Sequence, residues 1–171
     1  MKNFNDHQPL IIGSQSSDIT YADRPTVKVL IRKGDQVLII NKGLLPGGGV
    51  EEAETLEQAA ARELQEELGM SVDSLEPIGI VHQYRDFLQK RYVVYGYAAR
   101  LQSEDGSRSP QDDREASFRI RWMTVNAALA YVTSSISAKE AQPEASDRHQ
   151  GKLFNLMTTK ALLETLQGSR L

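Results

Sequence analysis

The sequence contains no cysteine, and this absence removes several kinds of chemistry at once. Disulfide bonds, thiolate metal sites and cysteine nucleophiles are all excluded. Histidine is scarce as well: the three that occur are His7, His82 and His149, and their spacing matches no metal-ligand motif. Any metal site in this chain would therefore have to use oxygen ligands.

Long apolar runs and a strong net charge are also missing. No run approaches the ~18 apolar residues of a membrane span, and the stretch 1–15 lacks the apolar segment of a signal peptide. The formal net charge of -3 gives no general attraction to nucleic acids or anionic membranes. We therefore expect a cytoplasmic protein, monomeric or homodimeric, whose partner is a small molecule and neither a membrane nor a nucleic acid.

The rest of the composition is that of an ordinary globular protein. Of the 171 residues, 40% are hydrophobic and 25% are charged. A chain of this length suggests one domain with extensions. We interpret residues 1–20 as an N-terminal arm that could pair as an edge strand, and residues 21–171 as a single domain.

Residue patterns predict the order of the secondary structure. Runs of β-branched and apolar residues predict strands over 26–32, 36–41, 75–84, 91–101 and 118–124. Helical periodicity predicts helices over 55–68, 125–132 and 152–166. Polar composition predicts a charged loop over 102–117 and a mobile linker over 133–150. This order favours a mixed sheet with helices on its faces, in the α/β (α+β) class, over a doubly wound parallel sheet.

Two of these predictions carry more detail. The first two strands should form a hairpin that is buried on both faces, because their apolar runs are almost continuous. The helix over 55–68 should begin at the N-cap Thr55 and end at Gly69.

The stretch from Leu45 to Met70 carries the chemistry. At ~100° of turn per helical residue, Glu63, Glu66 and Glu67 share an arc of roughly 100°. Like charges at these spacings repel, and one neighbouring arginine cannot neutralise three carboxylates. Mg²⁺ or Mn²⁺ prefers such oxygens and also binds substrate phosphates. The pattern therefore indicates hydrolysis of a phosphoanhydride by a metal-activated water.

The glycines that precede this helix agree with that interpretation. Gly47, Gly48 and Gly49 let the backbone approach a ligand closely, and a carbonyl of this loop could join the carboxylates around a metal. By itself, a glutamate-rich helix face is usually only a solvated face. The complete spacing G-x5-E-x7-R-E-U-x-E-E-x-G-U, with U apolar, would match by chance in roughly one in ten million chains of this size.

This spacing, from Gly48 to Met70, resembles the Nudix box at every defining position. The resemblance implies an α/β/α sandwich and Mg²⁺-dependent cleavage of a nucleoside diphosphate linked to another group. It also implies a role for each matching residue: metal ligation for Glu66 and Glu67, ligation or general-base action for Glu63, orientation of a glutamate for Arg62, a further carbonyl ligand in Gly48, and a structural or outer-shell role for Glu54.

Candidates outside the box complete the predicted site. Glu115 is predicted to be a further metal-binding carboxylate, with Asp112 and Asp113 as alternatives. Arg32 and Lys42, at strand ends near the box, are predicted to contact substrate together with Gly47. Four aromatic residues could stack on a base, although aromatics in strands are more often core: Tyr84, Phe87, Tyr95 and Tyr97.

The substrate stays open at this point. Relatives that act on ADP-ribose often carry a proline about 15 residues beyond the box, where this chain has Arg85 and Asp86. A nucleoside triphosphate, a nucleotide sugar and ADP-ribose are all compatible with the sequence. The alternative is a non-catalytic nucleotide-binding or regulatory module on the same fold, but the unbroken set of box glutamates favours an enzyme.

Overall fold

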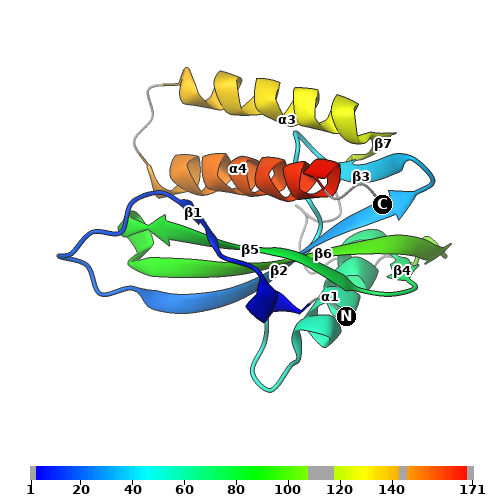
Figure 1. The fold of residues 1–171 in the computed structure, drawn as a ribbon, viewed down its shortest axis with the longest axis horizontal. Coiled ribbons are helices and arrows are strands. Elements are labelled where there is room, and N and C mark those ends of the chain that lie inside the picture. The colour runs from blue at the N-terminus through cyan, green and yellow to red at the C-terminus, as the bar shows by residue number, and fades with distance from the viewer. Residues whose placement is uncertain (1–2, 108–117, 143–145, 169–171) are drawn as a thin grey trace.

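A mixed sheet of seven strands forms the middle layer of the molecule (Figure 1). The computed structural model describes residues 3–107, 118–142 and 146–168. Along the sheet the strand order is β1-β5-β6-β2-β3-β7, and β4 pairs with β6 off this path. The strands are β1 Leu10–Ile12, β2 Ala22–Lys33, β3 Gln36–Ile40, β4 Met70–Val72, β5 Glu76–Arg85, β6 Lys90–Glu104 and β7 Ile120–Thr124. The pairs β1–β5 and β2–β6 are parallel and the other pairs are antiparallel, so the predicted mixed sheet is confirmed.

Helices cover both faces of this sheet. Helix α1 (Leu56–Leu68) lies on one face, and α3 (Val125–Glu140) and α4 (Asp147–Gly168) lie side by side on the other (Figure 1). Two short 3-10 turns, Phe4–Asp6 and Asp86–Leu88, complete the elements. In the part of the chain that is described, no helix is long and apolar enough to cross a membrane. The expected α/β/α sandwich is confirmed.

Strand β2 is the centre of the core because it is apolar on both faces. Val27, Val29 and Ile31 pack with α1, whereas Leu30 packs with residues of α3 and α4. All four are fully buried. The hairpin with β3 is also confirmed, with Arg32 opposite Val37.

The ends of α1 are set by local sequence, as predicted. The Thr55 side chain accepts a hydrogen bond from the backbone of Gln58, and the Gln58 side chain accepts one from the backbone of Thr55, which makes a capping box. At the other end Gly69 adopts a left-handed conformation with φ 62°. The buried stripe of α1 includes Leu64 and Leu68, which pack on the sheet. This contact fixes the rotation of the helix about its axis, and with it the direction in which the other side chains point.

The predicted linker over 133–150 is wrong in its extent. Helix α3 continues through Glu140, and α4 begins at Asp147 rather than at residue 152. The segment is polar because most of α3 faces solvent, but Val132 and Ile136, four residues apart, continue a stripe that packs on the core. The three-residue strand β4 was not predicted, because so short a segment carries no periodicity. The edge strand in the N-terminal arm is confirmed by the pairing of β1 with β5.

Candidate active site

The glycine-rich loop lies along a backbone edge that β2 leaves open. β2 pairs with β3 only through Arg32 and Lys33, so the edge of its earlier residues is available. The amides of Val27 and Val29 donate to the carbonyls of Gly48 and Pro46 at 2.9 and 3.0 Å. Gly47 has φ 120°, and a Cβ there would overlap the Val27 carbonyl, so this position requires glycine. The sheet itself therefore holds the loop beside α1.

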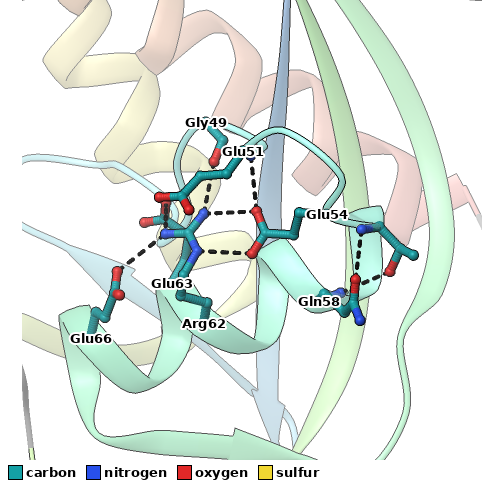
Figure 2. A network of polar contacts seen from close by, with 8 residues as sticks. Gly49, Glu51, Glu54, Gln58, Arg62, Glu63 and Glu66 are labelled. Carbon is teal, nitrogen blue, oxygen red and sulfur yellow. Dashed lines mark hydrogen bonds and ion pairs between the residues drawn. The ribbon is translucent and has the colours of Figure 1, made fainter.

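Arg62 connects this loop to three glutamates (Figure 2). Its guanidinium binds Glu54 through two hydrogen bonds of 2.9 and 3.1 Å. Further bonds reach Glu63 at 2.9 Å and Glu66 at 3.2 Å. It also donates to the Gly49 carbonyl at 2.9 Å. The bond to Glu54, above all, raises the pKa of Arg62, so the group is a permanent cation that orients the carboxylates around it.

Two carboxylates of α1 are buried against the glycine loop. Glu67 is only 5% exposed and accepts a hydrogen bond from the Gly47 amide at 2.8 Å. Glu63 is 8% exposed, and a Cβ at Gly48 would overlap its carboxylate, so the backbone approaches it as closely as a glycine allows. Burial raises the pKa of Glu63, although the nearby charges of Arg62 and Lys28 oppose this shift.

The donor set fits a hard divalent cation in its chemistry. Glu63 and Glu67 are buried carboxylates, and the single guanidinium of Arg62 is shared among Glu54, Glu63 and Glu66. Within residues 3–107, 118–142 and 146–168, however, no three acidic or histidine side chains converge into a cluster, because Glu63 and Glu66 turn toward Arg62 and Glu67 turns toward the Gly47 amide. The Gly48 carbonyl accepts from Val27 and keeps a second lone pair.

The predicted carboxylates outside the box cannot be placed in this site. Glu115, Asp112 and Asp113 lie outside the described residues. Their role as metal ligands therefore stays a prediction.

The box residues border a cavity of about 260 Å³. Its wall near α1 includes Gly47, Gly48 and Glu67. The far wall is built by β5, β6 and α4, and its polar and aromatic members are Gln83, Arg85, Tyr92, Asn155, Thr158 and Thr159. The cavity thus extends from the candidate metal ligands to the opposite helical layer, as a substrate site would require.

The basic and aromatic residues of this cavity differ from those predicted. Arg32 lies at the hairpin end of β2 and Lys42 is exposed after β3, and neither is among the described residues that line the cavity. The cations that do line it are Arg24, Lys28 and Arg85, and the aromatic side chain nearest to them is Tyr92. None of the four aromatic residues that could, from the sequence, have stacked on a base lines this cavity, and Tyr84 and Tyr97 are buried, as is usual for aromatics in strands. The other two are Phe87 and Tyr95.

Lys28 was not predicted as a site residue, although the sequence carries a signal for it. A lysine between Val27 and Val29 interrupts an otherwise apolar strand, which suggests a purpose for its charge. In the structure Lys28 is half-buried. Its ammonium donates to the Leu45 carbonyl at 3.0 Å and to the Gly47 carbonyl. A protein cation is thus built into the rim of the candidate metal site.

Replacing Lys28 by methionine is expected to tighten the binding of Mn²⁺ about 10-fold, which corresponds to about 1.4 kcal/mol. The variant removes a positive charge beside the carboxylates and frees the Gly47 carbonyl. Isothermal titration calorimetry with Mn²⁺ alone measures this. Lys33→Met is the matched control, because Lys33 is exposed at the other end of the same strand. Equal or weaker Mn²⁺ binding by Lys28→Met would contradict the prediction.

The raised pKa of Glu63 predicts a dependence of stability on pH. A carboxyl whose pKa is higher in the folded state than in the unfolded state disfavours folding once it is ionised. Wild type therefore loses free energy of unfolding as the pH rises above 4.5, the ordinary pKa of a glutamate. With a chelator present, Glu63→Gln should therefore melt at a higher temperature than wild type at pH 7, and at nearly the same temperature at pH 4. Scanning calorimetry at both values tests this, and a variant that melts lower at pH 7 would refute it.

The α/β/α fold and the arginine and glutamates of α1 together point to one class of protein. Comparison with known proteins gives the same class. A family model described as the NUDIX domain matches residues 22–144, so the chain belongs to the Nudix family. It is similar to the MutT NUDIX hydrolase from Burkholderia pseudomallei, with 20% identity, a TM-score of 0.55, and coverage of 85% of this chain and 98% of that one. A NUDIX hydrolase from Nitrosomonas europaea has 20% identity and a TM-score of 0.57, covering 82% of this chain and 89% of that one.

One relative is similar in sequence as well. The oxidized purine nucleoside triphosphate hydrolase of Danio rerio is 32% identical over 80 residues. That match spans 47% of this chain and 47% of the relative. The two solved structures, at 20% identity, support the fold alone.

Proposed function

We propose that this chain is a Mg²⁺-dependent (or Mn²⁺-dependent) pyrophosphohydrolase that cleaves the phosphoanhydride bond of a nucleoside diphosphate linked to another group. The observation that carries the proposal is the burial of Glu63 and Glu67 against a glycine loop at the edge of a cavity lined by cations. Carboxylates in such surroundings suit a divalent cation, and cations suit phosphate.

Each residue of the site has a task in this reaction. When bound, the divalent cation polarises a phosphoryl oxygen and acidifies water. Glu66 and Glu67 would hold it, and Arg62 fixes the orientation of Glu63 and Glu66. Glu63, whose pKa is raised by burial, is suited to accept a proton from the attacking water. Lys28 would balance charge that develops on the phosphoryl oxygens.

Nucleoside triphosphates are the first substrates to test, because the sequence relative is named for hydrolysis of oxidized purine nucleoside triphosphates. The panel should also contain nucleotide sugars and ADP-ribose. Product release is measured with Mg²⁺ and with Mn²⁺ for wild type, Glu63→Gln and Glu66→Gln. We expect turnover by wild type and a loss of at least about 100-fold in both variants.

The result that overturns the proposal is equally defined. If wild type hydrolyses no member of the panel, or if both variants match wild type, the catalytic assignment fails. Binding of a nucleotide without any turnover would instead support the non-catalytic module.

A further inference from the structure

Two arginines meet at one aromatic ring in the cavity that the box residues border, and the Arg24 guanidinium lies beside Gly49 of the glycine loop. Arg24 of β2 and Tyr92 of β6 are partners in the sheet register. The Arg24 guanidinium carbon lies 5.6 Å from the centre of the Tyr92 ring, and that of Arg85 lies 3.9 Å from it. All three residues line the cavity. We call Arg24, Arg85 and Tyr92 the arginine site.

Arg85 is a buried cation whose hydrogen-bond partners are neutral. It is 9% exposed. Two of its hydrogen bonds, of 3.1 and 2.7 Å, go to the side-chain oxygen of Gln83, and a third, of 3.0 Å, goes to that of Asn155. Asp147 is the carboxylate whose charge acts on it, but the two make no ion pair among the described contacts.

Burial of this charge is unfavourable in the protein alone. Desolvation lowers the pKa of Arg85, and the neighbouring charge of Arg24 acts in the same direction. A buried charge that makes no ion pair is strongly destabilising, and the Tyr92 ring and the charge of Asp147 offset only part of this cost. The amide oxygens of Gln83 and Asn155 hold the guanidinium in place without neutralising it.

Arg91 shows the contrast within the same strand. It lies beside Tyr92 on β6, but it forms an ion pair with Asp23, and this contact raises the pKa of Arg91. It borders a different hollow, with Tyr84 and Tyr21. The chain thus provides a carboxylate for the partly exposed Arg91 and leaves the buried Arg85 with neutral hydrogen-bond partners.

We propose that the arginine site binds a second phosphate of the substrate, a phosphomonoester separate from the scissile anhydride. This rests on the proposed function, which places the anhydride at the box glutamates. Among the described residues that line the cavity, the charged side chains are three cations, Arg24, Lys28 and Arg85, and one carboxylate, Glu67. The planar guanidinium fork suits phosphate oxygens. The favoured substrates are therefore nucleotides that carry an additional phosphate on the ribose.

Binding tests this without requiring catalysis. Calorimetry compares adenosine 5′-monophosphate with adenosine 2′,5′-bisphosphate and adenosine 3′,5′-bisphosphate, all in the presence of a chelator. At least one bisphosphate should bind wild type about 10-fold more tightly than the monophosphate. Arg24→Gln, at an exposed position that tolerates change, should reduce this ratio to about 3 or less. Arg91→Gln, the matched control, should leave the ratio unchanged.

Equal binding of the three nucleotides to wild type, or no binding of any of them, overturns the proposal. So does an equal effect of Arg24→Gln and Arg91→Gln. Arg85→Lys provides a second variant, which keeps the charge but cannot keep all three hydrogen bonds. It should weaken the binding of the bisphosphate more than the binding of the monophosphate. If guanosine 5′-monophosphate binds more tightly than adenosine 5′-monophosphate while the extra phosphate does not increase affinity, the arginine site recognises a base and the proposal is wrong.

Hydrolysis separates this proposal from the one on which it rests. ADP-ribose and its 2′-phosphate form a matched pair of anhydrides. A higher kcat/KM for the phosphorylated member, lost in Arg24→Gln, supports both proposals. Turnover of the two at equal rates overturns the arginine site and retains the hydrolase. If the bisphosphate binds more tightly but neither ADP-ribose compound and no member of the nucleotide panel is hydrolysed, the arginine site is retained and the hydrolase proposal is overturned.

Discussion

Replacing Glu67 by glutamine is expected to lower kcat/KM for nucleotide hydrolysis by about 100-fold or more. Glutamine keeps an oxygen that can accept the hydrogen bond of the Gly47 amide, so the loop should stay in place. What is lost is the negative charge of a buried carboxylate next to the cavity. The measurement is the rate with Mg²⁺ on the best substrate of the panel, together with the affinity for Mn²⁺ by calorimetry, which should fall in parallel.

The matched control for this variant lies on the same helix. Glu57 also accepts a hydrogen bond through its carboxylate, from the Tyr97 hydroxyl at 2.8 Å, but it is absent from the cavity lining. Glu57→Gln should therefore change kcat/KM less than about 2-fold. A Glu67→Gln variant with wild-type activity, or a Glu57→Gln variant that loses as much, would show that Glu67 is not a metal ligand.

Replacing Arg62 by glutamine is expected to reduce both stability and activity. The free energy of unfolding should fall by roughly 2 to 4 kcal/mol, because Glu54, Glu63 and Glu66 lose a partner in partly buried surroundings. For a chain of this size that is a decrease in melting temperature of roughly 5 to 15 °C. Since Glu63 loses its orientation as well, kcat should fall by about 10-fold or more even at temperatures where the variant is folded.

A second ion pair of the same type provides the control. Arg91 and Asp23 pair on the surface, where the two side chains are 33% and 50% exposed. Exposed pairs contribute about 0 to 1 kcal/mol, so Arg91→Gln should shift the melting temperature by a few degrees at most. If the two variants are equally stable, the network around Arg62 is not the element that holds the loop to the helix.

The sequence predicted the parts of the molecule whose signals are local. The capping box at Thr55 and the left-handed Gly69 depend on residues within one turn of the helix, so both ends of α1 followed from pattern alone. The apolar run of β2 likewise predicted its burial on both faces. The extent of α3 did not follow, because a helix with one narrow buried stripe has the composition of a loop.

The site was predictable only where one segment supplies it. The box places glutamates, arginine and glycines within 23 residues, from Gly48 to Met70, and their order carries the information. The far wall of the cavity joins β5, β6 and α4. Arg85 and Asn155 are 70 residues apart in the chain and become neighbours only through the packing of α4 on the sheet. No spacing rule could have brought them together, whereas Lys28 was missed although its charge within an apolar strand could have indicated it.

The attachment of the glycine loop to the open edge of β2 has a consequence for how the proposed activity would be lost on heating. Backbone amides of Val27, Val29 and Val50 are engaged in this attachment, as they would be in a sheet ladder. These amides should therefore exchange with deuterium as slowly as the central strands do, since only cooperative opening of the sheet would release them. Heating should then abolish catalysis and unfold the sheet in a single transition, with no range of temperature in which a folded protein has lost its active-site loop.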